Sequence, residues 1–340
     1  MIQRVQELKV SSVVRRVPED LFGHIEPRRK RPERGDVVVC SVSKVGWHRE
    51  LENRFGRYRR LFEGDRVVVA IGNRYATGEF EGKIPERVRY GMELLNAGGV
   101  CGKLTGKNLL IQDPTKLLFM GYVVSGGEVV NLRDHALGEK DYRREVPVVL
   151  VVGSGMDAGK TTTAATIIKA LVTAGHRVCA GKVTGTARSK DILLMSDAGA
   201  DLVLDHVDAG YPSTYKCQRK QVMEIIDVIY SNLASEDPDY IVIEIADGVF
   251  QRETKMILRE GRFMDRVSRI FFSASDSLAA YGGHTFFEEL DLEITAFSGP
   301  VANSRLMVRE VYEHTGLPCI APKGRGSDIL ALIHGGGRSP

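Results

Sequence analysis

Apolar residues change their spacing near residue 147, and this change divides the chain into two regions. Before it, short β-branched runs alternate with turn-forming residues, which is typical of β-rich domains. After it, apolar strands alternate with amphipathic helical stretches, which predicts a mostly parallel sheet with helices on both faces. The sequence therefore predicts a doubly wound α/β fold that is preceded by a small β-rich, barrel-like domain.

The same patterns predict the domain boundaries. We expect a basic N-terminal arm at residues 1–34, the β-rich domain at 35–134, a charge-rich linker at 135–146 and the α/β domain at 147–340. In the β-rich domain the expected elements are strands at 36–43, 65–72, 100–105, 108–112, 117–124 and 128–132, and a helix at 87–97. In the α/β domain they are strands at 148–153, 177–182, 201–206, 239–245, 266–273, 292–298 and 317–321, and helices at 159–174, 190–199, 214–234, 303–315 and 326–334. Because charge dominates the arm, its removal is expected to leave a folded protein.

The segment Gly153–Thr163 carries the strongest chemical signal. An apolar run ends at Gly153, a loop of small residues follows, and Gly159-Lys160-Thr161 opens a helical stretch. This is the order of a phosphate-binding P-loop, in which backbone N–H groups at a helix N-terminus face an anion. Lys160 adds a positive charge, and the Thr161 hydroxyl is a ligand for Mg²⁺. The residues expected to bind the nucleotide here are Gly153, Ser154, Gly155, Gly159, Lys160, Thr161 and Thr162.

Five residues separate Gly153 from Gly159, one more than in the common P-loop, and this spacing resembles dethiobiotin synthetase and its relatives. In that family the loop reads Gly-Thr-Asp-Thr-Glu-Val-Gly-Lys-Thr. The stretch 174–185 is similar to the family's second strand with its terminal lysine, and 241–248 is similar to the strand that ends in an acidic metal ligand. The match covers about residues 147–330. It also fits a P-loop family that contains bacterial D-glutamate N-acetyltransferase.

This chain also departs from the dethiobiotin synthetase pattern. Gly155 and Met156 replace polar loop residues, and Ala246-Asp247 interrupts the small-residue run after Glu244. The substrate of that family is therefore not carried over to this chain. Asp157 matches the acidic loop position, and we interpret it as a group that binds an amine or Mg²⁺ beside the phosphates.

Charged residues are predicted to converge at the carboxyl ends of the strands, where ligands bind in α/β sheets. Glu244 ends an apolar run, and burying a lone carboxylate costs several kcal/mol unless a cation offsets it. We therefore expect Mg²⁺ to be held by Thr161, Asp191 and Glu244; the resemblance also implies an aspartate near Mg²⁺ at position 191. Lys160 and Lys182 are expected to neutralise phosphates. A surface salt-bridge cluster is the alternative.

Other candidates have weaker support. Asp247 is a second metal ligand or a base, and Thr184 lies in the polar turn after Lys182. The hydroxyls of Ser213 and Thr214 either hold a substrate carboxylate or cap a helix. Asn303 is in a loop that we interpret as the adenine edge of the site.

Composition limits the class of protein. With 27% charged and 43% hydrophobic residues, the chain resembles soluble globular proteins. It has neither an apolar run of about 20 residues nor a signal-peptide pattern, so we expect a cytoplasmic protein without a membrane span. Five scattered cysteines form no zinc spacing and are interpreted as reduced packing residues. Residues 1–60 hold 15 Lys and Arg against 8 Asp and Glu, which favours a solvated surface over a polyanion site.

Three function classes fit these residues. The first is an ATP- and Mg²⁺-dependent enzyme that phosphorylates an anionic small molecule, a carboxylate by preference, to drive ligation or ring closure; the resemblance to dethiobiotin synthetase and cobyrinic acid amidating synthetases implies this reaction. The second is an N-acyltransferase with coenzyme A in the P-loop. The third is a GTP-binding cofactor-maturation protein, although no guanine-specific signature is present. Nucleic-acid binding is a weaker option because aromatic residues near the basic N-terminus are few. A homodimer is expected from the resemblance and because the site rim offers few apolar walls.

Overall fold

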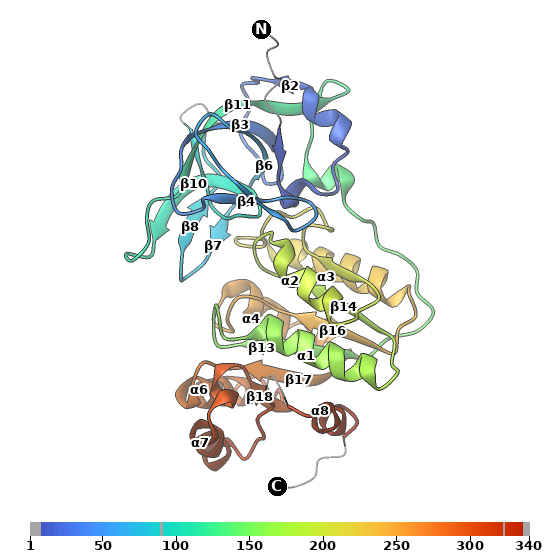
Figure 1. Cartoon of the computed structure of the whole chain (residues 1–340). Coiled ribbons are helices and arrows are strands. Elements are labelled where there is room, and N and C mark those ends of the chain that lie inside the picture. Colours follow the sequence, from blue (N-terminus) through green and yellow to red (C-terminus); the bar gives the residue numbers. More distant parts are fainter. Residues whose placement is uncertain (1–7, 89–90, 322–323, 336–340) are drawn as a thin grey trace. The chain divides into compact units, whose positions relative to one another are not determined.

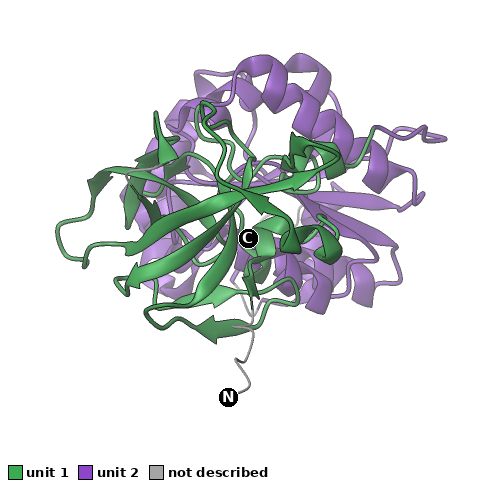
Figure 2. Ribbon diagram, turned by 90° about the horizontal axis from the view of Figure 1, so that it is seen from above, with its two compact units in different colours: residues 1–138, 185–190, 206–216 green, residues 139–184, 191–205, 217–340 purple. Residues whose placement is uncertain are grey.

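The computed structural model describes residues 8–88, 91–321 and 324–335 (Figure 1). The chain divides into two compact units (Figure 2). The first comprises residues 1–138, 185–190 and 206–216, and the second comprises 139–184, 191–205 and 217–340. Two short segments of the expected α/β domain therefore belong to the first unit.

The first unit is built mainly on antiparallel strand pairs, and β6 pairs with β1 and β10 in parallel. Its strands are β1 (Lys9–Val10), β2 (Ile25–Glu26), β3 (Val37–Lys44), β4 (Glu50–Glu52), β5 (Tyr58–Arg60), β6 (Arg66–Ile71), β7 (Arg74–Tyr75), β8 (Phe80–Lys83), β9 (Met92–Leu94), β10 (Val100–Lys107), β11 (Thr115–Ser125) and β12 (Glu128–Val129). Its 3₁₀ turns include η1 (Ser12–Val14), η2 (Glu19–Gly23) and η4 (Leu132–His135). The ten-stranded sheet runs β1-β6-β3-β11-β9-β10-β8-β7, β2 and β12 each pair with β11 beside this path, and β6 also pairs with β10. This extra pairing closes a circuit β6-β3-β11-β9-β10, as in a small barrel.

Two predictions of secondary structure in this unit were wrong. Residues 92–94, inside the expected helix at 87–97, form strand β9, and Met92 and Leu94 are buried on one side of it. Residues 108–112, an expected strand, form a loop between β10 and β11. Leu109 and Leu110 are each 92% exposed in that loop. The first error comes from mistaking a period of two for a helical period.

The expected basic arm contributes several apolar side chains from residues 8–22 to the first unit's core. Strand β1 pairs with β6, and Val13, Val14, Val17 and Phe22 are buried in one apolar cluster with residues of β3 and β6. The expectation that residues 1–34 are dispensable for folding is therefore corrected.

We expect Phe22→Ala to lower the free energy of unfolding by about 3–5 kcal/mol, because the ring is only 3% exposed and its removal leaves a cavity. The matched control is Phe62→Ala in the same unit, where the ring is 62% exposed. Urea unfolding monitored by circular dichroism measures both. Equal midpoints for the two variants would contradict the packing of the N-terminal segment.

The two inserted segments are anchored in the first unit by polar contacts. The buried Glu52 carboxylate accepts hydrogen bonds from the N–H groups of Ser189 at 2.7 Å and Lys190 at 3.1 Å. Asp208 forms an ion pair with Arg15 at 2.7 Å. These contacts explain why the unit boundaries differ from the continuous division at residue 147 that the sequence suggested.

The second unit is an α/β fold with a six-stranded parallel sheet. Its strands are β13 (Val148–Gly153), β14 (Val178–Lys182), β15 (Val203–Asp205), β16 (Tyr240–Glu244), β17 (Val267–Ser273) and β18 (Ala296–Ser298), in the order β15-β14-β16-β13-β17-β18. Its helices are α1 (Lys160–Thr173), α2 (Ser189–Asp197, whose first two residues belong to the first unit), α3 (Arg219–Ala234), α4 (Arg252–Leu258), α5 (Gly261–Met264), α6 (Ser277–Glu288), η5 (Pro300–Asn303), α7 (Arg305–Thr315) and α8 (Gly326–Ile333). The prediction of a parallel sheet in an α/β fold is confirmed. The expected strand at 317–321 is reduced to an isolated bridge between Cys319 and Phe297.

Alternating side chains on the strands explain why helices cover both faces of this sheet. Phe271 lies in the core cluster that contains apolar residues of α1 and α8. The neighbouring Phe272 contacts Phe287 of α6 at a ring distance of 5.8 Å. Since successive strand residues point to opposite faces, α1 and α8 pack on one face and α6 on the other. Among the described residues, no helix is long and apolar enough to span a membrane.

Candidate phosphate-binding site

The loop after β13 has the geometry of a phosphate cradle. Strand β13 lies between β16 and β17, and all six of its residues are buried. At Gly153 a Cβ atom would approach the Ser273 carbonyl oxygen to 2.6 Å, so only glycine fits. Asp157 and Gly159 have positive φ angles of 61° and 90°, which turn the chain into helix α1. Such loops direct backbone N–H groups at an anion.

Lys160 is the first residue of α1, and its side chain folds back over the loop. The side chain is buried, and Nζ donates a hydrogen bond of 2.7 Å to the Gly155 carbonyl. Burial lowers the pKa of Lys160, and the nearby carboxylates of Glu244 and Asp247 oppose that shift. The ammonium is thus positioned over the loop, where phosphates would displace the carbonyl as its partner.

Sheet register brings Lys182 and Glu244 together. They are the last residues of β14 and β16 and stand opposite each other in the parallel pairing. Lys182 Nζ lies 3.6 Å from Glu244 Oε1 and forms an ion pair with Asp191 in the first turn of α2. Thr161 Oγ1 donates to Glu244 Oε1 at 3.3 Å. Thr161, Lys182, Asp191 and Glu244, which the sequence predicted to bind Mg²⁺ or phosphate, therefore form one cluster.

The charges in this cluster perturb one another. Burial lowers the pKa of Lys182, but the carboxylates of Asp191 and Glu244 outweigh burial and hold it above its ordinary value. Burial raises the pKa of Glu244, and Lys182 partly offsets that shift. With Lys160 and Asp247, two cations face three carboxylates, so the cluster as a whole is negative when every group is ionised. A phosphate ligand requires an additional cation at this site.

The donor set fits Mg²⁺. Glu244 is 1% exposed, and its Oε2 has no hydrogen-bond partner among the described residues. An orphaned buried carboxylate oxygen is the kind of atom that a hard cation satisfies. The described residues contain no group of three or more His, Cys, Asp and Glu arranged for a metal. Mg²⁺ tolerates this, because it commonly binds one or two carboxylates and completes its octahedron with water and phosphate oxygens.

Thr184 and Asp247 flank the cluster. Thr184 is fully buried, and its hydroxyl donates to the Ala246 carbonyl, so it fixes the turn after β14 to the turn after β16. The Asp247 N–H donates to Gln251 Oε1 at 2.9 Å. Gly248 packs against the P-loop, since a Cβ atom there would lie 2.7 Å from the Ser154 carbonyl oxygen. The Asp247 backbone therefore lies close to the phosphate loop.

Four other candidates lie outside the cluster of Thr161, Lys182, Asp191 and Glu244. Asp157 is exposed at the turn of the loop, and Asn303 is exposed at the end of η5. Ser213 and Thr214 belong to the first unit, where Thr214 Oγ1 accepts from the Gly185 N–H at 3.0 Å. Because α3 begins at Arg219 after Gln218, neither hydroxyl caps that helix as the alternative interpretation expected.

Sequence reasoning missed a buried group of hydroxyls beneath the loop. Thr163 Oγ1 lies 3.0 Å from Ser273 Oγ and 2.9 Å from Ser298 Oγ. Both serines end strands of the sheet, so polar residues at predicted strand ends were the available signal. The three hydroxyls connect the first turn of α1 to β17 and β18, and they hold the P-loop helix in place.

Comparisons with known proteins give limited similarity. No protein-family model and no curated protein matches the chain. Among solved structures, the signal recognition particle receptor FtsY from Elizabethkingia anophelis in complex with GDP has 16% identity over 59% of this chain and 67% of that chain, with a TM-score of 0.38. The signal recognition particle 54 kDa protein from Aeropyrum pernix K1 in complex with GDP has 17% identity over 57% of this chain and 47% of that chain, with a TM-score of 0.38. This chain thus spans about half of the latter protein. At this level of similarity, the ligands and functions of those proteins are not transferred to it.

Proposed function

We propose that the protein is an ATP- and Mg²⁺-dependent enzyme that phosphorylates an anionic small molecule, a carboxylate by preference, to drive ligation or ring closure. The observation that carries the proposal is the cluster around the phosphate loop. Lys160 lies over the loop, and the buried Glu244 beside it has an oxygen without a hydrogen-bond partner among the residues that the structure describes. Phosphoryl transfer depends mainly on positioning and charge neutralisation. The cluster supplies both once a divalent cation is added.

The chain's own residues would divide this work. The loop N–H groups and Lys160 would hold the terminal phosphates of the nucleotide. Thr161, Asp191 and Glu244 would hold Mg²⁺, which supplies charge neutralisation of the phosphates. Lys182, which already pairs with Asp191 and Glu244, would turn to the transferred phosphoryl group or to the anionic substrate when the metal takes those carboxylates. Asp247 is the remaining carboxylate for proton transfer.

A binding panel tests this function. Isothermal titration of the full chain with ATP, GTP and coenzyme A, each with and without Mg²⁺, is expected to give the tightest binding for ATP with Mg²⁺. Metal-independent binding of coenzyme A would instead support the acyltransferase, and a preference for GTP would support the maturation protein.

We further propose a two-fold homodimer, because a second subunit would shield a reactive phosphoryl intermediate from water. A monomer mass by light scattering would discard the dimer.

A further inference from the structure

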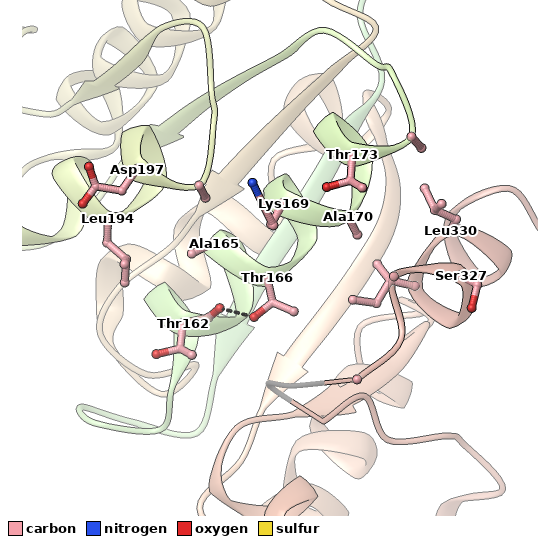
Figure 3. A pocket seen from close by; sticks show the side chains of 15 residues that line it. Thr162, Ala165, Thr166, Lys169, Ala170, Thr173, Leu194, Asp197, Ser327 and Leu330 are labelled. Carbon is pink, nitrogen blue, oxygen red and sulfur yellow. Dashed lines mark hydrogen bonds between the residues drawn. The ribbon is translucent and has the colours of Figure 1, made fainter.

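A groove of about 670 Å³ runs along the solvent side of α1, between α2 and α8 (Figure 3). Its volume lies in the range of small-molecule sites. All of its lining residues belong to the second unit. Of the residues that line the groove, the site proposed above includes only Thr162.

The position of Thr162 links the groove to the phosphate loop. Thr162 follows Lys160 and Thr161 in the first turn of α1, and it is exposed. In Figure 3 its side chain stands at one end of the groove, with Thr166 one turn further along and Thr173 at the other end. The groove therefore begins in the helix turn that directly follows the phosphate loop.

The walls of the groove are largely apolar and carry a few polar groups. Small and aliphatic side chains form most of the surface, with Leu194 of α2 and Leu330 of α8 on opposite sides. Lys169, Asp197 and Ser327 add charged and hydroxyl groups to its lining. Apolar walls with a small number of polar groups are typical of sites for cofactors and nucleosides.

We infer that the end of the groove nearest the P-loop binds the nucleoside of the nucleotide whose phosphates occupy the loop. This inference rests on the proposed function. From Thr162 to Thr173 the helix rises by about 16 Å, so a nucleoside fills only the first part of the groove. The far part would be occupied only by a longer ligand, such as the pantetheine arm of coenzyme A.

Two matched variants on the same helix face test the inference. Thr166→Trp fills the groove beside the phosphate loop, and Thr173→Trp adds the same bulk two turns away, about 10 Å along the helix. We expect Thr166→Trp to weaken ATP–Mg²⁺ binding at least about tenfold, with no change for Mg²⁺–tripolyphosphate, which has no nucleoside. We expect Thr173→Trp to change neither.

The outcomes separate the two proposals. Equal ATP–Mg²⁺ affinity for wild type and folded Thr166→Trp, with retained tripolyphosphate binding, would overturn the groove assignment and leave the phosphate site intact. Failure of wild type to bind either ATP or tripolyphosphate would overturn the proposed function together with the groove. Weaker binding of coenzyme A by both tryptophan variants, with ATP unaffected, would assign the groove to coenzyme A and contradict the nucleoside. Thermal unfolding of each variant shows that its fold is retained.

Discussion

Lys160→Ala is expected to reduce nucleotide-dependent turnover by about 10²–10³-fold, the typical effect of removing one group that stabilises transition-state charge. Its Nζ contacts only the Gly155 carbonyl by hydrogen bond within the part of the chain that the structure describes. It also lies near the Glu244 and Asp247 carboxylates. Without it, the cluster keeps three carboxylates and one cation, so phosphates meet greater repulsion.

The matched control is Lys220→Ala, which removes an exposed lysine from α3. Steady-state kinetics with ATP–Mg²⁺, together with titration calorimetry, should show normal behaviour for this control and a loss for Lys160→Ala. Because the Lys160 ammonium is desolvated, its removal is not expected to lower the thermal unfolding temperature substantially. Wild-type turnover and affinity in a folded Lys160→Ala protein would reject the P-loop assignment.

The strands of the α/β unit were mostly predicted from the sequence because their signals are local, whereas helices α4, α5 and α6 were not predicted. Most of the strands β13–β17 are apolar runs, each of the five ends in a glycine or polar residue, and Gly153 and Gly159 stand at a recognisable spacing. Parallel strands share one carboxyl edge, so the convergence of Lys182 and Glu244 also followed from the pattern. Their direct opposition in the sheet required the register between β14 and β16, which the sequence does not specify.

The remaining features depend on contacts between distant residues. The three hydroxyls of Thr163, Ser273 and Ser298 form one cluster, although Thr163 and Ser298 are 135 positions apart in the sequence. They meet only because β13, β17 and β18 are neighbours in the sheet. The segments 185–190 and 206–216 join the first unit through partners such as Glu52, which lies far away in the sequence. No local propensity reports such pairings.

The β-rich unit was less predictable for a different reason. Buried residues Val88, Met92 and Leu95 are spaced i, i+4, i+7, which imitates a helix face. In the structure Met92 and Leu94 alternate along strand β9, whose pairing with both β10 and β11 overrides the local pattern. Strand propensity depends strongly on neighbouring strands, so short strands of this kind are poorly specified by sequence.

Glu244→Gln is expected to raise the Mg²⁺ concentration needed for half-maximal ATP binding by at least about tenfold, since loss of even an outer-shell partner typically costs 10–100-fold in metal affinity. The amide keeps the shape of the side chain but removes the anionic ligand. Binding of ATP without metal should change much less. The reason is that Glu244 Oε2, which is buried and without a hydrogen-bond partner among the described residues, would contribute to binding only as a ligand of a cation.

Asp247→Asn is the informative comparison, because it removes a charge from the same cluster at a half-buried position two residues beyond the buried turn residue Ile245. Mg²⁺ titrations followed by ATP calorimetry distinguish the two carboxylates. If Glu244 ligates the metal, its variant shifts the titration and Asp247→Asn leaves the Mg²⁺ midpoint close to wild type while slowing turnover. The reverse pattern would transfer the metal to Asp247. In that case Glu244 would act by positioning the side chains of Thr161 and Lys182, which it contacts.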